Sequence, residues 1–276
     1  MIKDLVVNLA VDGGKDSTRD YAISVAAAFG AHLTGVAFAY EPLAPGSIFD
    51  GVSASIIDTQ RAACRDAADE AAKSFDEAVR RAGISGDSAI VSASIEGCGE
   101  VFARIARHYD LATVGQPKPD NSWPDDMIAE ATLFGAGHPI LAVPYIQKGP
   151  FAVNRALLCW DGSRSAARAI ADALPILARS KQVEIITIAA QDDKRPEIPG
   201  VDIAHHLARH SLKVELKRIV APDTDVASTI LSHAADSGAD LIVMGGYGHS
   251  RFREFVLGGA TRDIFSSMTV PVLMSH

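Results

Sequence analysis

RALLCWDGSRSAARAIADALPILARS, residues 155–180, carries the pattern that decides the fold. A short apolar run leads into an Asp-Gly pair at Asp161 and Gly162, and an alanine-rich stretch follows. An apolar run without alternation is typical of a parallel strand that is buried on both faces. The segment therefore predicts a strand, a turn and a covering helix of an α/β protein.

The same pattern opens the chain, which indicates an internal duplication. Residues 4–30 (DLVVNLAVDGGKDSTRDYAISVAAAFG) run from an apolar strand through Asp12 and Gly13 into another alanine-rich helix. Aligning Asp12 with Asp161 also pairs Gly13 with Gly162. YDLATVG and HPILAVP later in the first half match ADLIVMG and VPVLMSH in the second. These repeats predict two domains, residues 1–147 and 150–276.

Each half has the coarse order of five strands that alternate with four helices, which predicts two tandem doubly wound open parallel sheets in a Rossmann-like α/β fold. In the first half, residues 53–83 predict an unusually long second helix. In the second half, strands are expected near residues 155–160, 183–189, 213–220, 240–245 and 270–274. The helices between them are expected near residues 164–179, 200–210, 224–237 and 259–267.

Composition and charge exclude several classes of protein. The 276 residues have a formal net charge of −8, which argues against a general nucleic-acid binder, so any anion site must be local. The three cysteines form no Cys-x-x-Cys pair and the N-terminus has no signal-peptide pattern, which predicts a cytoplasmic protein. Residues 21–40 lack charge but contain Gly30 and then β-branched and aromatic residues, which favours a helix, a stop and a strand over a membrane span.

The loop GGYGHSRFREFVLGGATRDIF, residues 245–265, is the strongest candidate for a binding site. Ligands of doubly wound sheets lie beyond the carboxyl ends of the strands, where this loop and the Trp160-Asp161 turn should converge. Glycines let backbone N–H groups approach a phosphate, and a helix that begins near Gly259 would add its N-terminus. His249 and Arg251 could add charge or hydrogen bonds. The alternative is a flexible connector whose glycines serve no ligand.

The spacing of these glycines, Gly-x2-Gly-x9-Gly behind ADLIVMG, resembles the nucleotide-binding signature of the universal stress protein family. The turn after the first strand at Asp161 is similar to that family's first-strand motif, and two such units resemble its tandem members over essentially the whole chain. The resemblance implies that Asp161 contacts adenosine, that Ala189 lines the adenine pocket, and that Met244 and Gly245 flank the nucleotide. It implies that the phosphates meet Gly248, Gly258, Gly259 and Ala260.

This sequence departs from the family pattern in two places. The family usually has Ser or Thr where Gly259 stands, so a hydroxyl is lost although the Gly259 N–H remains. In the first half, the segment that follows Gly115 is two residues shorter than its counterpart, and it is rich in proline and aspartate instead of glycine. Asp12 is expected to cap a helix or shape a turn. One nucleotide site is therefore predicted, in the second half, beside a degenerate first half.

Other signals are weaker. His205, His206 and His210 have helical spacing that a metal could use, but no further ligand lies nearby in sequence, which favours a solvated face and no metal site. Cys98 lies near a helix start, where a thiol pKa can fall, yet a thiol without a chemical role is the better interpretation. Walker and G-x-G-x-x-G patterns are missing, and nothing resembles a serine or cysteine catalytic set.

The function predicted from these residues is that of a cytoplasmic stress-response regulator that binds ATP or a related adenine nucleotide, with or without Mg²⁺, and hydrolyses it slowly or not at all. Its surface would be read by a protein partner. One alternative is an ATP-hydrolysing or adenylating enzyme, and another is a nucleotide-free interaction protein whose glycine loop serves packing. The resemblance also implies that the halves pair through their last strands, and it leaves a homodimer open. Neither nucleic acid nor membrane is expected as a partner.

Overall fold

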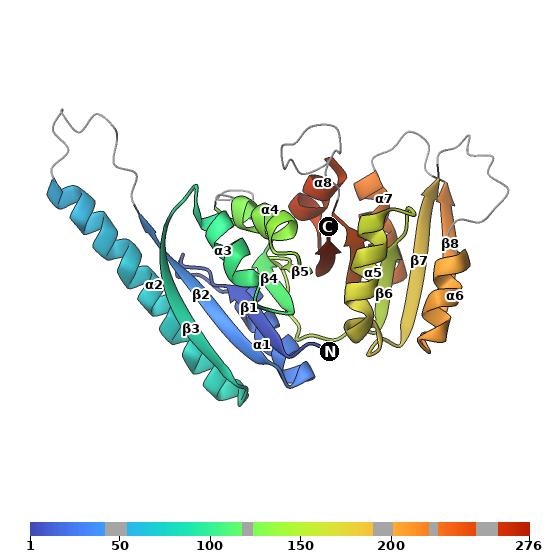
Figure 1. Cartoon of the computed structure of the whole chain (residues 1–276), viewed down its shortest axis with the longest axis horizontal. Helices are drawn as coiled ribbons and strands as arrows, with labels where there is room; N and C mark the ends of the chain where they lie inside the picture. Colours follow the sequence, from blue (N-terminus) through green and yellow to red (C-terminus); the bar gives the residue numbers. More distant parts are fainter. Residues whose placement is uncertain (42–53, 118–123, 190–200, 221–225, 247–258) are drawn as a thin grey trace.

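The computed structural model describes residues 1–41, 54–117, 124–189, 201–220, 226–246 and 259–276 (Figure 1). In the first half these residues form β1 (Asp4–Asn8), α1 (Ser17–Phe29), β2 (His32–Glu41), α2 (Ala54–Ala82), β3 (Gly86–Ser94), α3 (Cys98–Ala106), β4 (Leu111–Gly115), α4 (Asp125–Gly135) and β5 (Ile140–Val143). In the second half they form β6 (Arg155–Cys159), α5 (Arg164–Leu177), β7 (Gln182–Ala189), α6 (Val201–Arg209), β8 (Val214–Val220), α7 (Val226–Ser237), β9 (Leu241–Gly245), α8 (Gly259–Ser267) and β10 (Val272–Ser275).

The predicted α/β architecture is confirmed. Every expected strand and helix of the second half is present, with bounds within two residues of the prediction, and the long second helix of the first half is α2. Within each half the strands are parallel and have the order 3-2-1-4-5. The strand order therefore reverses between β1 and β4 in the first half and between β6 and β9 in the second.

The two five-stranded sheets are joined into one. β10 pairs antiparallel with β5, with Leu273 opposite Leu141, so the described strands form a single sheet of ten. The expected pairing of the halves through their last strands is thus present within one chain. All four residues of each joining strand are buried.

Alternation along the strands divides the core into two layers. In β5, Leu141 faces the cluster under α1, α2, α5 and α6, whereas Ile140 faces the cluster under α3, α4, α7 and α8. Leu273 and Val272 of β10 divide in the same way. Each layer therefore runs continuously across both halves, and helices cover both faces of the sheet, as Figure 1 shows.

The uncharged stretch 21–40 contains a helix end and a strand, as expected. Gly30 ends α1 in the left-handed conformation with φ 60°, and its N–H donates to the carbonyls of Ala26 and Ala27. Glycine takes this conformation without the strain that a Cβ would add. Among the described residues, no helix combines the length and the apolar character that crossing a bilayer requires.

Candidate functional site

The carboxyl ends of β6 and β9 are the switch point of the second half, and four of the predicted site residues lie at these strand ends: Trp160, Asp161, Met244 and Gly245. Trp160 directly follows β6, and its N–H donates to the Ile186 carbonyl at 2.9 Å, so sheet pairing continues one residue past the strand. The half-buried Trp160 ring packs against the core layer under α5. Trp160 therefore has a packing role that accounts for its presence without a ligand.

A tight turn follows Trp160 and leads into α5. The exposed Asp161 accepts a hydrogen bond from the Ser163 N–H through Oδ1 at 2.9 Å, and Gly162 adopts φ 79°. Ser163 caps α5, because its Oγ accepts a hydrogen bond from the Ala166 N–H at 3.1 Å. The turn thus presents the Asp161 carboxylate and the N-terminus of α5 on the same short segment, with the exposed Arg164 as the first helical residue.

Gly245, at the end of β9, is a glycine for a packing reason. A Cβ built there would lie 2.6 Å from the backbone nitrogen of Ala166 and 2.7 Å from the backbone carbon of Ser165. Gly246 is similar, because its Cβ would lie 2.8 Å from a methyl carbon of Leu133 on α4. Contact with the backbone of α5 therefore requires a glycine at position 245, whereas at position 246 a Cβ would require the Leu133 side chain of α4 to move.

The remaining predicted residues differ in where the structure places them. The Met244 side chain is fully buried in the core, so any contact of this residue with a ligand is through its backbone. Ala189 ends β7 opposite Val220 of β8. Gly259 is exposed at the start of α8 and Ala260 is half-buried; no described atom lies within 4 Å of a Cβ built on Gly259. Gly248, His249, Arg251 and Gly258 lie outside the described residues.

Sequence reasoning missed two residues near this turn. Ser163 as the helix cap and Arg164 in the first turn of α5 were not among the predicted site residues, although a serine three residues before an alanine-rich helical run is a capping signal. Their position matters because free N–H groups and a positive side chain at a helix N-terminus favour an anion.

The equivalent edge of the first half differs from the alignment that the sequence predicts. Leu9 is the structural counterpart of Trp160, because its N–H donates to the Val36 carbonyl at 2.9 Å in the same sheet position. Ala10 therefore takes the place of Asp161, and the alignment of Asp12 with Asp161 is wrong. The segment between β1 and its helix cap has seven residues (9–15), whereas its counterpart has three (160–162).

Two aspartates share the roles that the sequence assigned to Asp12. Asp12 shapes a turn, with its Oδ1 accepting a hydrogen bond from the Gly14 N–H at 3.1 Å. The cap of α1 is Asp16, which accepts from the Arg19 N–H at 2.8 Å and from the Ala10 N–H at 3.0 Å. Burial raises the pKa of Asp16, and these two backbone donors oppose that rise.

The loop after β4 also differs in length from its counterpart after β9. Gln116 corresponds to Gly246, because both N–H groups donate to the last strand of their half, to Val143 and to Ser275, each at 2.8 Å. Nine residues (116–124) lead from β4 to α4, against thirteen (246–258) from β9 to α8, while α4 is two residues longer than α8. The shortening is therefore in the loop, and the first turn of α4 is acidic.

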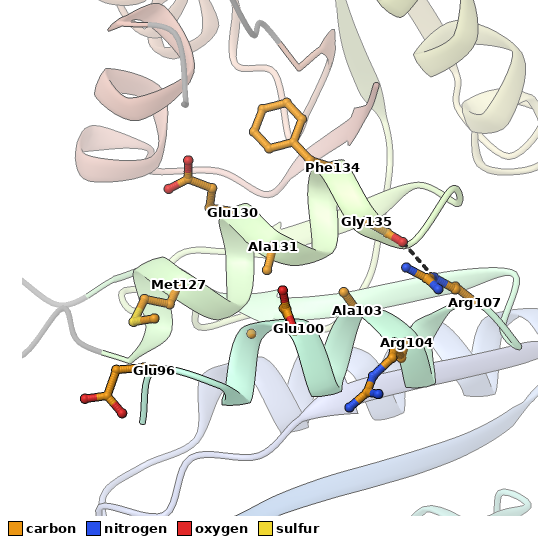
Figure 2. A pocket seen from close by; sticks show the side chains of 11 residues that line it. Glu96, Glu100, Ala103, Arg104, Arg107, Met127, Glu130, Ala131, Phe134 and Gly135 are labelled. Carbon is orange, nitrogen blue, oxygen red and sulfur yellow. Dashed lines mark hydrogen bonds between the residues drawn. The ribbon is translucent and has the colours of Figure 1, made fainter. Parts of the chain in front are cut away.

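Two of the cavities in the described part of the first half bear on the site. One of about 380 Å³ lies at the switch point, between the ends of β1 and β4. A second, of about 560 Å³, is a groove between α3 and α4, with Ala103, Met127 and Phe134 among its lining residues (Figure 2). The Arg107 Nε donates to the Gly135 carbonyl at 2.9 Å at one end of that groove. The groove lies on the helical layer and not at the strand ends, so it is not the equivalent of a nucleotide site.

The weaker signals have structural explanations. The rings of His206 and His210 contact each other edge to face with their centroids 4.8 Å apart, and no group of three potential metal ligands occurs among the described residues. Cys98 is buried at the start of α3, and its thiol donates to the Ile95 carbonyl at 3.0 Å. Burial raises the pKa of Cys98 to about 11, which is the opposite of what a reactive thiolate requires.

Comparison with known proteins gives the family of the second half and the fold of the whole chain. The model of the universal stress protein family matches residues 153–276. A universal stress protein of Synechocystis is 27% identical over 127 residues, which are 44% of this chain and 42% of that protein, so the match spans less than half of the relative. The crystal structure of a universal stress protein from Archaeoglobus fulgidus is 15% identical, with a TM-score of 0.67 over 99% of this chain and 97% of that one.

A shorter universal stress protein, solved in complex with cAMP, is 20% identical over 46% of this chain and 99% of its own, with a TM-score of 0.36. That ligand is a property of that protein.

Proposed function

We propose that this chain is a tandem member of the universal stress protein family, because the family model matches residues 153–276 and the first half repeats the same strand order. Its function would be that of a stress-response regulator that binds ATP or a related adenine nucleotide at the β6–β9 switch point. The three cysteines are unpaired, which supports a cytoplasmic protein. The first half does not take part in phosphate binding.

The observation that carries this proposal is Gly259. It begins α8, it is exposed, no described atom lies near its missing Cβ, and its φ is not in the left-handed region. Among the described residues, neither packing nor backbone conformation therefore requires a glycine here, although glycine weakens a helix relative to alanine. A phosphate that approaches the N–H groups at this helix N-terminus would account for the missing side chain.

The nucleotide would lie across the edge of the sheet. In this proposal Asp161 binds the adenosine part, with the ring of Trp160 beside it and the Ala189 backbone lining the adenine. The backbone of Met244 and Gly245 lies beneath, and the amides of Gly248, Gly258, Gly259 and Ala260 meet the phosphates, with His249 and Arg251 supplying charge. Mg²⁺ would accompany the phosphates. Occupancy would change the surface that a protein partner reads, and hydrolysis would be slow or would not occur.

A nucleotide-free interaction protein is the second candidate, and Gly245 favours it. Contact with the backbone of α5 accounts for this glycine without any ligand. The two candidates differ in a single measurable property, the affinity for nucleotide.

Titration calorimetry of the nucleotide-stripped chain with Mg-ATP tests the proposal. We expect one site per chain, and Gly259→Val should weaken binding at least tenfold, equivalent to about 1.4 kcal/mol. No described atom lies near that position, so valine meets no steric conflict with the described residues. The melting temperature of the variant checks that a loss of binding does not reflect misfolding.

A matched pair of turn residues supplies the control. Asp161→Ala and Asp12→Ala each remove a side chain–backbone bond of the same kind, to Ser163 and to Gly14. Only Asp161→Ala should weaken ATP binding, again by about tenfold. If the parent chain does not bind Mg-ATP, the proposal is wrong and the nucleotide-free interaction protein is the better hypothesis.

A further inference from the structure

The cavity at the switch point of the first half contains an unsatisfied polar group. Asn8, the last residue of β1, is only 7% exposed and lines the cavity. Its Oδ1 has no hydrogen-bond partner among the residues that the structure describes. A buried acceptor without a partner destabilises the folded state, so a polar group at this position requires an explanation.

Comparison with the second half shows that the fold does not require asparagine here. Asn8 and Cys159 are structural counterparts, because each ends the first strand of its half one residue before the matched backbone bonds of Leu9 and Trp160. Cys159 is buried in the core layer under α7 and α8. The same strand position therefore accepts an apolar side chain in one half and carries an amide in the other.

A second buried amide lies on the same edge. Gln116 is 3% exposed, lines the cavity with Asn8, and its Oε1 accepts a hydrogen bond from the Tyr145 N–H at 3.2 Å. Its counterpart in the second half is Gly246, which has no side chain. The first half has thus acquired two buried amides at the point where doubly wound sheets bind ligands.

The charges and rings of the cavity indicate the chemistry of its occupant. Its charged lining residues among those described are Asp12, Asp16, Asp125 and Lys15, a formal charge of −2. Such a lining disfavours phosphate and favours donor groups or a cation. Tyr40 and Tyr145 also line the cavity, and aromatic walls favour a flat ligand.

We propose that the first half binds a small, flat, phosphate-free molecule that carries amino or amidine donors, with one donor hydrogen-bonded to Asn8 Oδ1. The first half is then a second binding site of different chemistry and not a degenerate copy. The volume of about 380 Å³ accommodates a single-ring or two-ring molecule. This inference does not depend on ATP binding in the second half.

Benzamidinium and benzoate are matched probes, because they share a flat shape and differ in charge and in donors. Titration monitored by calorimetry or NMR should show benzamidinium binding once per chain with a dissociation constant on the order of 1 mM. Benzoate should bind at least tenfold more weakly. Equal binding of the two probes, or no binding of benzamidinium, overturns the proposal.

Asn8→Cys, which installs the residue of the other half, locates the site. It should weaken benzamidinium binding about tenfold and raise the melting temperature of the ligand-free chain by about 2–4 °C, because an unsatisfied acceptor is removed. Asp12→Asn, at an exposed position, should weaken binding severalfold, and the melting temperature of the variant checks that the fold is kept. Asp161→Ala should leave benzamidinium binding unchanged, which separates this test from that of the nucleotide site.

The result for Asn8→Cys also distinguishes a ligand from a buried water. If the variant binds benzamidinium as the parent does, Asn8 is not part of a site. If it melts at a lower temperature than the parent, the amide is satisfied by internal water and serves stability. Either result overturns the proposal.

Discussion

The two halves of the chain have the same strands in the same order, yet the edges where those strands end have little in common. Where the second half has Asp161, Cys159 and Gly246, the first has Ala10, Asn8 and Gln116. The sheet registers are matched by equivalent backbone bonds, although individual side chains differ within the strands and at their ends. Hydrogen bonding and core packing therefore fix the positions of the strands, whereas the residues at and beyond their ends can differ in charge and in hydrogen-bonding groups.

The largest expected difference in stability between the two halves is at the glycines that end β4 and β9. Gly245→Ala should lower the free energy of unfolding by about 3 kcal/mol, because its Cβ meets the backbone of α5 at 2.6 Å. Gly115→Ala, at the equivalent position, meets only the Thr18 hydroxyl at 3.0 Å and should cost less than about 1 kcal/mol. Chemical denaturation measures the loss of unfolding free energy in both variants. Equal losses would show that α5 and α1 move equally to accommodate the added methyl group, and would contradict the prediction.

A smaller effect is expected at the opposite ends of the first strands. In the second half the buried Glu184 accepts from Arg155 at 2.9 Å and contacts His233 Nε2 at 2.9 Å. Arg155→Met should cost about 2 kcal/mol, because a buried carboxylate loses its main partner while His233 remains. Equilibrium unfolding of the double variant Arg155→Met/Glu184→Gln should recover at least half of that loss.

The first half supplies the contrast to this buried pair. Asp4 and Thr34 stand at the places of Arg155 and Glu184, and the Thr34 hydroxyl donates to Asp87 at 3.0 Å. Thr34→Val should therefore cost no more than about 1 kcal/mol in the same assay. A larger cost than that of Arg155→Met would contradict the assignment of the stronger network to the second half.

A pH-dependent effect distinguishes Cys159 from its counterpart Asn8, which does not titrate. Burial raises the pKa of the Cys159 thiol to about 12 from an ordinary value of 9.0, with Asp161 adding to the rise. The folded chain keeps this proton while the unfolded chain releases it, so stability is lost as the pH rises from 9 toward 12. At pH 10 the loss is about 1.4 kcal/mol.

Cys159→Ala should therefore reduce the fall in unfolding free energy between pH 8 and pH 10 by that amount. Denaturation at the two pH values measures the difference directly.

Much of the fold follows from local patterns. Buried apolar runs, alanine-rich helical stretches and stop signals such as Gly30 depend on neighbours in sequence, so the elements of the second half lie within two residues of their predicted bounds. The sequence alignment of Asp12 with Asp161 was wrong because an Asp-Gly pair indicates a turn but not how far that turn lies from the end of the strand. Four additional residues before Asp16 moved that turn away from the strand end.

The candidate site was less predictable. Gly245 was assigned to a nucleotide, but its first requirement is contact with α5, which depends on packing between segments far apart in sequence. Asn8 gave no signal, because an asparagine after an apolar run is an ordinary turn residue until its burial is known. Gly248, His249, Arg251 and Gly258 lie outside the described residues, and their roles stay predictions.

The antiparallel pairing of β5 with β10 has a consequence for how the chain behaves on dilution. Each of these buried strands would be an open, apolar sheet edge in an isolated half, ready to pair with another molecule. Covalent linkage turns that association into an intramolecular step, with an effective concentration set by the connector between Val143 and Arg155. The paired state of the two halves is therefore independent of how much protein is present.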